Sequence, residues 1–149
     1  MKIYSKINLL PRIQDIFFIA LFFAVLVLGN RMLNLDGDLP RHLLMGQQIL
    51  LTKSVPTTEL FIHPYLGRHY VTHEWLADVF FFGMYSAAGL KGIVLFSAIA
   101  LASTFFLIYQ YVSTRFQNRL GAFILVTWGA LATSLNWATR PHLFSMLFL

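Results

Sequence analysis

Cysteine is absent from this chain of 149 residues, and charged residues are few. The lack of cysteine excludes disulfides, cysteine-based zinc sites and thiol nucleophiles. Only 11% of the residues are charged, whereas an ordinary soluble domain has about 25%. Basic residues outnumber acidic ones by 11 to 6, but they are scattered and form no stripe of the kind that binds nucleic acid. We therefore expect no nucleic-acid partner.

Glycine-rich phosphate loops, a Ser-His-Asp order and nucleotide fingerprints are missing as well. The sequence is instead strongly apolar, since 58% of its residues are hydrophobic and its mean hydropathy is +0.68. Apolar chains of this kind cross membranes as helices, because the backbone polar groups must then be satisfied within each segment. We predict one all-α membrane domain with several spans and contact with membrane lipid.

Long apolar runs predict three complete membrane spans and the start of a fourth. Residues 16–28 are apolar without interruption, and extension to residues 13–33 reaches the length of about 20 residues that a span requires. The second and third spans are expected in two uncharged stretches, residues 92–114 and 120–139. A last apolar run, residues 141–149, is too short to cross, so a truncated fourth span in a longer protein is expected.

Basic residues near the ends of these segments predict the orientation in the membrane. Three of them precede the first span, and Arg115 and Arg119 separate the second span from the third. Because basic residues favour the cytoplasmic side, the N-terminus is expected in the cytoplasm and residues 34–91 in a large external loop. The protein is thus expected to be a multi-pass protein of the cell's inner, cytoplasmic membrane.

Two alternatives concern these segments. The basic N-terminus followed by an apolar core would also fit a signal peptide, although the later spans favour an uncleaved first helix. Residues 75–90 are apolar enough to be a span themselves. That arrangement would place Arg115 and Arg119 outside, against the positive-inside rule.

Two interfacial helices are predicted in the external loop. The first covers about residues 39–53, because Asp38 can cap its first turn and Pro40 is tolerated there. The second covers about residues 74–88 and is expected to lie at the membrane surface with Asp78 toward water. The segment between the two helices is rich in turn-forming residues and is expected to be extended or irregular.

Two acids, Asp36 and Asp38, follow the first span directly and are separated only by Gly37. Two carboxylates can share Mg²⁺ or Mn²⁺, or one can act as a base while the other orients it. Turn formation and helix capping are the ordinary structural explanations for such residues. Their place at the membrane boundary favours function, because a carboxylate there loses hydration unless something compensates it. We predict that both are catalytic residues or ligands of a divalent cation.

A third candidate acid, Glu74, lies beside His73 at the expected start of the second loop helix. Stabilisation of the helix N-terminus is the structural explanation for this glutamate. Asp78 follows four residues later on the same face, and repulsion between the two carboxylates predicts a cation or a basic partner nearby. Zinc is not expected, since Ala77 stands where a His-Glu-x-x-His site needs its second histidine. We predict that Glu74 is catalytic and that His73 contacts substrate.

Several basic side chains of the loop suit a phosphate, because arginine offers a fork of donors that matches phosphate oxygens. Lipid headgroups would attract the same side chains equally well. The candidates are Arg41, His42, Arg68 and His69, of which His42 and Arg68 are predicted to contact substrate. Aromatic residues in the loop fit an interfacial belt as well as a sugar-stacking surface, and these are Tyr65, Tyr70 and Trp75.

The loop also contains a series of short motifs: Asp36-Gly37-Asp38, His42-Leu43, Val55-Pro56-Thr57-Thr58, Gly67-Arg68 and His73-Glu74-Trp75-Leu76. Together they resemble the first external loop of bacterial multi-span proteins in the GT-C glycosyltransferase superfamily. Arg140-Pro141, before a renewed apolar run, is similar too, so the resemblance covers roughly residues 28–145. The pattern departs at Pro40-Arg41, where an aromatic pair is expected.

This resemblance implies an integral membrane enzyme that takes a sugar from a polyprenyl-phosphate carrier and transfers it to an acceptor on the outer face. In that superfamily an acid-containing motif of the first external loop supplies the catalytic carboxylate, and Asp36 and Asp38 match it. Members of the superfamily are much longer, so the 149 residues alone are expected to be inactive. The alternative is a non-enzymatic membrane subunit or a transporter fragment.

Overall fold

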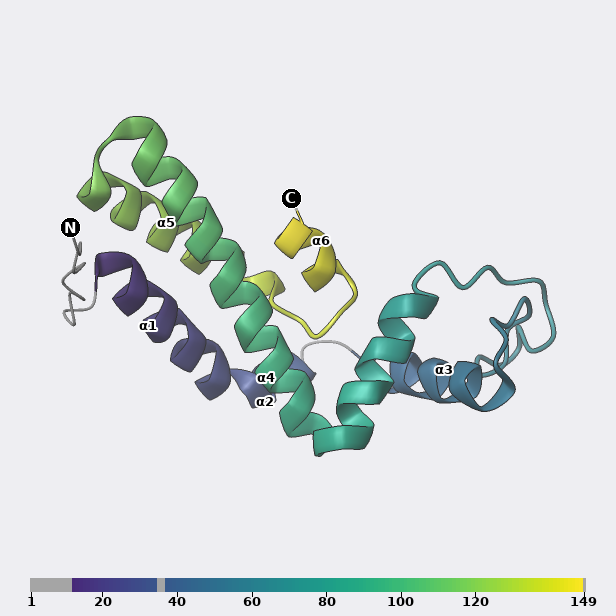
Figure 1. Cartoon of the computed structure of the whole chain (residues 1–149). Coiled ribbons are helices and arrows are strands. Elements are labelled where there is room, and N and C mark those ends of the chain that lie inside the picture. Colours follow the sequence, from purple (N-terminus) through teal and green to yellow (C-terminus); the bar gives the residue numbers. More distant parts are fainter. Residues whose placement is uncertain (1–11, 35–36, 149) are drawn as a thin grey trace, which may run out of the picture.

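The computed structural model of the chain describes residues 12–34 and 37–148, and its regular structure is helical (Figure 1). The only strand-like feature in those two ranges is an isolated antiparallel bridge between Thr58 and His69. The all-α prediction is therefore confirmed. The helices in chain order are α1 (Ile13–Val27), α2 (Gly29–Asn34), α3 (Leu39–Thr52), α4 (Trp75–Phe116), α5 (Arg119–Thr133), the 3-10 turn η1 (Ser134–Asn136) and α6 (His142–Phe148).

The first apolar segment forms two consecutive helices where the sequence predicts one. α1 begins with a capping interaction in which the Arg12 backbone N–H donates to the Asp15 carboxylate at 2.9 Å. The helix is interrupted at Leu28, and α2 follows at once. The interruption coincides with close packing on α4, because a Cβ atom at Gly29 would lie 2.6 Å from Cγ1 of Val94.

The longest helix, α4, is bent at Gly89, where φ is 64° and ψ is −157°. This backbone conformation suits glycine, which has no Cβ atom to clash. Figure 1 shows the two parts of α4, residues 75–88 and 90–116, diverging from that point. The bend matters for length, because 42 residues in one straight helix would extend about 63 Å, twice the thickness of a hydrocarbon core.

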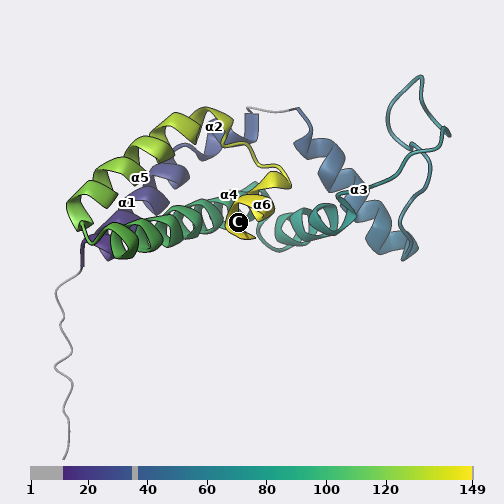
Figure 2. The same cartoon turned by 90° about the horizontal axis from the view of Figure 1, so that it is seen from above.

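The second part of α4 packs with α1 and α5 into a three-helix assembly that we call the bundle (Figures 1 and 2). Its core is apolar and partly aromatic. The ring of Phe17 in α1 lies 5.8 Å from Tyr109 of α4 and 5.7 Å from Phe123 of α5, measured between centroids. Other buried members of this core are Val25, Leu101, Phe105, Val126 and Ala130.

The helix expected over residues 120–139 is shorter in the structure, since α5 ends at Thr133. Hydroxyl groups near its end bond back to the preceding turn, with Ser134 Oγ donating to the Leu131 carbonyl at 2.7 Å. The chain then turns through η1 and buries Trp137, whose ring lies 5.8 Å from Phe105. Burial of this indole explains why the chain leaves the helical path early.

A second assembly, the loop unit, is made of α3, residues 53–74 and the first part of α4. Gly46 lets α3 approach α4 closely, because a Cβ atom there would overlap the Asp78 carbonyl group. Residues 57–70 form a hairpin in which the Glu59 N–H donates to the Arg68 carbonyl at 2.9 Å. Figure 2 shows α3 and this hairpin extending away from α1 and α5.

In the part of the chain that the structure describes, α4 is the one helix long and apolar enough to cross a membrane. α1 is apolar but has only 15 residues. This composition supports membrane association and does not by itself give the number of spans.

Candidate functional site

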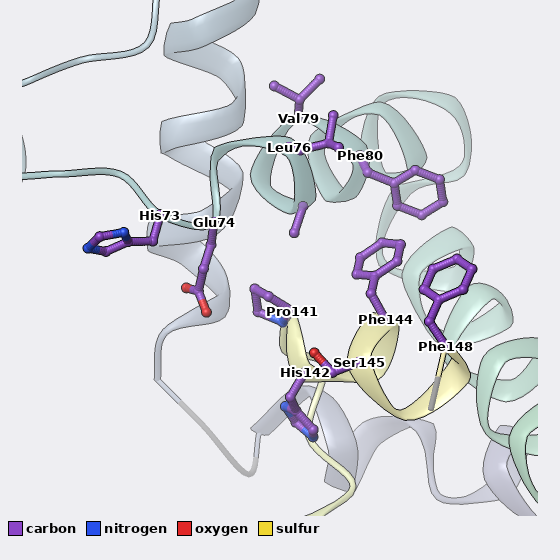
Figure 3. Close-up of a pocket in the computed structure, with 11 residues that line it drawn as sticks. His73, Glu74, Leu76, Val79, Phe80, Pro141, His142, Phe144, Ser145 and Phe148 are labelled. Atoms are coloured by element: carbon purple, nitrogen blue, oxygen red, sulfur yellow. The ribbon is translucent and has the colours of Figure 1, made fainter.

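The main pocket lies between the first turns of α4 and α6 and has a volume of about 780 Å³ (Figure 3). One end is polar and contains side chains of Glu74, His142 and Ser145. The rest is a wall of aliphatic and aromatic side chains, among them Leu76, Val79, Phe80, Phe144 and Phe148. A pocket of this composition suits a ligand with both an apolar and a polar part.

Glu74 is the carboxylate of this pocket. It is the residue that precedes α4, and its side chain makes no capping hydrogen bond to the helix. Figure 3 shows the carboxylate directed toward the turn that carries Pro141 and His142, whereas the His73 ring points away. A carboxylate in this position also lies close to the positive end of the α4 dipole, a favourable interaction. Glu74 is therefore available to a ligand.

Asp38 is connected to the pocket through Arg140. The Arg140 Nη2 atom lies 3.1 Å from Asp38 Oδ2, which joins residues 102 positions apart in the chain. Arg140 directly precedes Pro141, a residue that lines the pocket. Both partners are about half exposed, so the pair adds at most about 1 kcal/mol to stability. Asp36, the other predicted acid, lies outside the described residues.

His42, which the sequence predicts as a substrate contact, is buried and bonds Asp78. The distance from His42 Nδ1 to Asp78 Oδ1 is 2.6 Å, and the side chains are only 8% and 4% exposed. The expectation that Asp78 faces water is therefore wrong, since α3 covers that face of α4. His42 is also the basic partner that the repulsion between Glu74 and Asp78 predicts.

Arg41 and Glu59 form a second connection between α3 and the hairpin. Arg41 Nη2 donates to Glu59 Oε2 at 3.0 Å, and the guanidinium lies 4.8 Å from the centre of the Tyr70 ring. Backbone N–H donation from Phe61 lowers the pKa of Glu59 against the opposing effect of burial, and bonds from Arg41 and the Ile62 N–H lower it further. Glu59 thus holds the hairpin as a buried carboxylate.

A cavity of about 10 Å³ connects these polar pairs with Glu74, and it is about the size of one water-sized probe. Its polar lining comes from Arg41, His42, Tyr70, Thr72, Glu74 and Asp78. The Nε atom of Arg41 is buried in this region without a protein hydrogen-bond partner. The polar pairs of the loop unit thus lie next to Glu74, with one small cavity between them.

Arg68, like His42, is a predicted substrate contact that lies away from the main pocket. It belongs to the hairpin, where its guanidinium lies 5.2 Å from the centre of the Tyr65 ring, and it is not among the residues that line the main pocket. His73 does line that pocket. The structure thus brings Glu74 and His73 to one cavity and leaves His42 and Arg68 outside it.

A divalent cation would need several oxygen ligands at one point. Within residues 12–34 and 37–148, no three His, Asp or Glu side chains form a group able to hold one. Asp38 is already paired with Arg140. Because Asp36, the other predicted ligand, lies outside the described residues, the divalent-cation site stays a prediction.

Sequence reasoning did not select His142 and Ser145, which face the polar end of the pocket. The sequence contains a signal for His142, which directly follows the Arg140-Pro141 pair of the family resemblance. Nothing local indicated that this pair folds back beside Glu74. Searches with protein-family models, among curated proteins and among solved structures found no match to this chain.

Proposed function

We propose that this chain contributes the external loop and membrane helices of a glycosyltransferase that uses a polyprenyl-phosphate sugar. The observation that carries the proposal is the amphipathic pocket, in which Glu74 and His142 lie at one end of an apolar wall. Its shape and polarity suit a carrier whose apolar chain ends in a charged sugar phosphate. The motifs that resemble the GT-C superfamily lead to the same function independently.

The membrane setting of this proposal is supported by the bundle's outer surface. Large apolar side chains are exposed on its helices, with Phe23 at 59%, Leu125 at 61% and Trp128 at 71%. Such surfaces are expected where lipid, not water, surrounds the protein. We place three spans at α1 with α2, at the second part of α4, and at α5 with η1. The last pair would extend roughly 28 Å, close to the hydrocarbon thickness.

The proposed orientation puts the N-terminus in the cytoplasm and the loop unit outside the cytoplasmic membrane. Arg115 and Arg119 support it, because they flank the connection between α4 and α5 and basic residues favour the cytoplasmic side. The main pocket then faces the outer side, where the acceptor would enter. A carrier lipid could reach the pocket from the bilayer along its apolar wall.

The reaction itself is a substitution at the sugar's anomeric carbon. The acceptor hydroxyl oxygen bonds to this carbon, the bond from carbon to phosphate oxygen breaks, and its electron pair leaves with the phosphate. The hydroxyl proton passes to a carboxylate that acts as general base, for which we propose Glu74 or an acid of the Asp36-Gly37-Asp38 motif. Positive charge on Arg140 would stabilise the departing phosphate. Burial lowers the pKa of His142 below its ordinary value of 6.5, so the role proposed for His142 is hydrogen-bond donation to the phosphate from a neutral ring.

Because the 149 residues alone are expected to be inactive, transfer would be measured on membranes from cells that express the whole gene. With labelled polyprenyl-phosphate sugars, we expect Glu74→Gln to lower transfer about 100-fold or more if Glu74 is the base. Asp38→Asn should also lower transfer, since Asp38 holds Arg140 beside the pocket. The matched control is Asp15→Asn, the same aspartate-to-asparagine change as at Asp38 but in the first turn of α1. It should leave transfer unchanged.

Protein levels in the membrane should be equal for all variants, as judged by immunoblotting. Wild-type transfer by Glu74→Gln would remove this residue from the mechanism. Unchanged transfer by both variants, or no transfer by the wild type with any carrier-linked sugar, would favour the non-enzymatic membrane subunit.

A further inference from the structure

The tip of the hairpin, residues 60–66, is an exposed apolar surface. Its large side chains are each between 36% and 52% exposed, and they are Leu60, Phe61, Ile62, Tyr65 and Leu66. His63 and Pro64 between them are exposed as well. A loop in water is usually polar, so a continuous apolar tip requires an environment other than bulk water.

The tip is held in place rather than loosely attached. Both the Phe61 and Ile62 N–H groups donate to Glu59 Oε1, at 3.0 and 3.2 Å. The other oxygen of that carboxylate accepts from Arg41 of α3. Directly before the tip, the bridge between Thr58 and His69 closes the hairpin. The apolar side chains are therefore presented outward by a structure that buries its single carboxylate.

The exposed charge around the tip is positive, because Glu59 is buried and Arg68 is exposed. From residue 60 to residue 73 the sequence contains no acid, while it contains Arg68 and three histidines. Arg68 lies over the Tyr65 ring at 5.2 Å, which places an apolar ring and a cation together on the surface. Apolar side chains combined with basic ones are typical of segments that bind the headgroup region of a membrane with anionic lipids.

The position of the hairpin in the fold is compatible with such a contact. Figure 1 shows the two parts of α4 meeting in a V, with the first part inclined to the second. With the second part as a span, the bend at Gly89 lies near the membrane surface, and the first part leads away from the bundle. The hairpin precedes it and is thus carried sideways from the bundle, at the level of the interface.

We propose that the hairpin tip inserts into the boundary between lipid headgroups and acyl chains and anchors the loop unit on the outer leaflet. The ligand is the lipid surface itself, bound through Phe61, Ile62, Tyr65 and Leu66, with Arg68 beside the headgroup phosphates. This inference rests on the membrane setting proposed above and not on the transfer chemistry. The anchor would keep α3 and the start of α4 in fixed positions around the pocket.

Single cysteines can test the anchor because the natural chain has none. The chain is placed in nanodiscs of mixed phosphatidylcholine and phosphatidylglycerol, with a nitroxide label at Ile62→Cys, at Leu107→Cys in the second part of α4, or at Ser54→Cys. Ser54 is an exposed polar residue of the same loop unit and serves as the matched control. Collisions with oxygen report exposure to lipid, and collisions with a neutral nickel chelate report exposure to water.

We expect the ratio of oxygen to nickel collisions to be several-fold higher at Ile62 than at Ser54, and highest at Leu107. Adding Phe61→Ser and Leu66→Ser should bring the Ile62 label back toward the value for Ser54. Equal ratios at Ile62 and Ser54 would overturn the anchor while Leu107 still reports lipid. Protection of the Ile62 label from both reagents would show a protein contact instead and overturn it too. A water-exposed Leu107 label would contradict the proposed membrane span in α4 and therefore the anchor as well.

Discussion

The bundle and the loop unit satisfy their polar side chains in opposite ways. In the bundle, hydroxyl groups bond within their own helix, as when Thr104 donates to the Ala100 carbonyl at 2.9 Å and Thr127 to the Phe123 carbonyl at 2.7 Å. In the loop unit, side chains bond across the fold, as between His42 and Asp78. Local bonding suits a segment surrounded by lipid, because each helix is then satisfied before it packs.

Two consequences follow from this difference. The bundle is held by apolar contact and should tolerate changes of charge and pH. The loop unit depends on a close backbone approach and on a few specific pairs, so single substitutions there should loosen it selectively. Amide hydrogen exchange separates the two responses, since it reports local opening in each helix.

The largest effect is expected at Gly46, where α3 touches α4. A methyl group there would overlap the Asp78 carbonyl and lie 2.8 Å from Cβ of Phe82. Because backbone cannot move aside as a flexible side chain does, Gly46→Ala should destabilise the α3 contact by roughly 3 kcal/mol. The measurement is faster exchange of the α3 amides, with α1 and α5 amides as internal reference.

Gly83→Ala is the matched control, because nothing lies within 4 Å of a Cβ atom at that position of α4. It should leave exchange in α3 unchanged or slow it, since alanine is favoured over glycine in a helix. Equal exchange in Gly46→Ala and wild type would refute the close approach of the two helices.

An intermediate effect is expected from the pair of His42 and Asp78. Asp78→Ala leaves a buried imidazole nitrogen without its partner, which costs about 1–3 kcal/mol. Replacing both residues, as in His42→Leu with Asp78→Leu, should recover much of this loss, because no buried polar group then remains unpaired. Faster exchange of the α3 amides in the double variant than in Asp78→Ala would contradict this explanation. The pair would then contribute more than the hydrogen bond that each side chain provides for the other.

The smallest effect is expected at Glu59, and it should depend on pH. The folded state lowers the pKa of this carboxyl below its ordinary value of 4.5. The charged form therefore stabilises the hairpin above that value, and the contribution disappears as pH falls through the lower, folded pKa. Glu59→Gln should loosen the hairpin by about 1 kcal/mol at neutral pH and match wild type in strong acid.

Comparing wild type with Glu59→Gln at each pH cancels the intrinsic pH dependence of amide exchange at Phe61 and Ile62. The control is Asp15→Asn in the bundle, which should leave the exchange rates of the hairpin amides unchanged. A difference that stays constant from neutral to acidic pH would contradict the role of the charged carboxylate.

Much of the secondary structure could be predicted from local sequence signals. The helix expected over residues 39–53 is present as Leu39–Thr52, with Pro40 in its first turn. The expected cap is wrong, because the Asp38 side chain makes no capping hydrogen bond and instead bonds Arg140. The helix expected over residues 74–88 is present in the first part of α4, which ends at Gly89. The early end of α5 could not be predicted, because it depends on burial of Trp137 against Phe105, two residues far apart in the sequence.

In the candidate site, too, some features follow from local sequence and others from tertiary contacts. The sequence by itself determined the helical class, the apolar surfaces and the presence of acids at the starts of two loop helices, because composition, periodicity and caps are local properties. Only the tertiary structure decided that Asp78 is buried against His42, that Asp38 meets Arg140 and that Glu74 faces His142. These pairs join distant segments, and no local preference selects one partner over another until the helices pack.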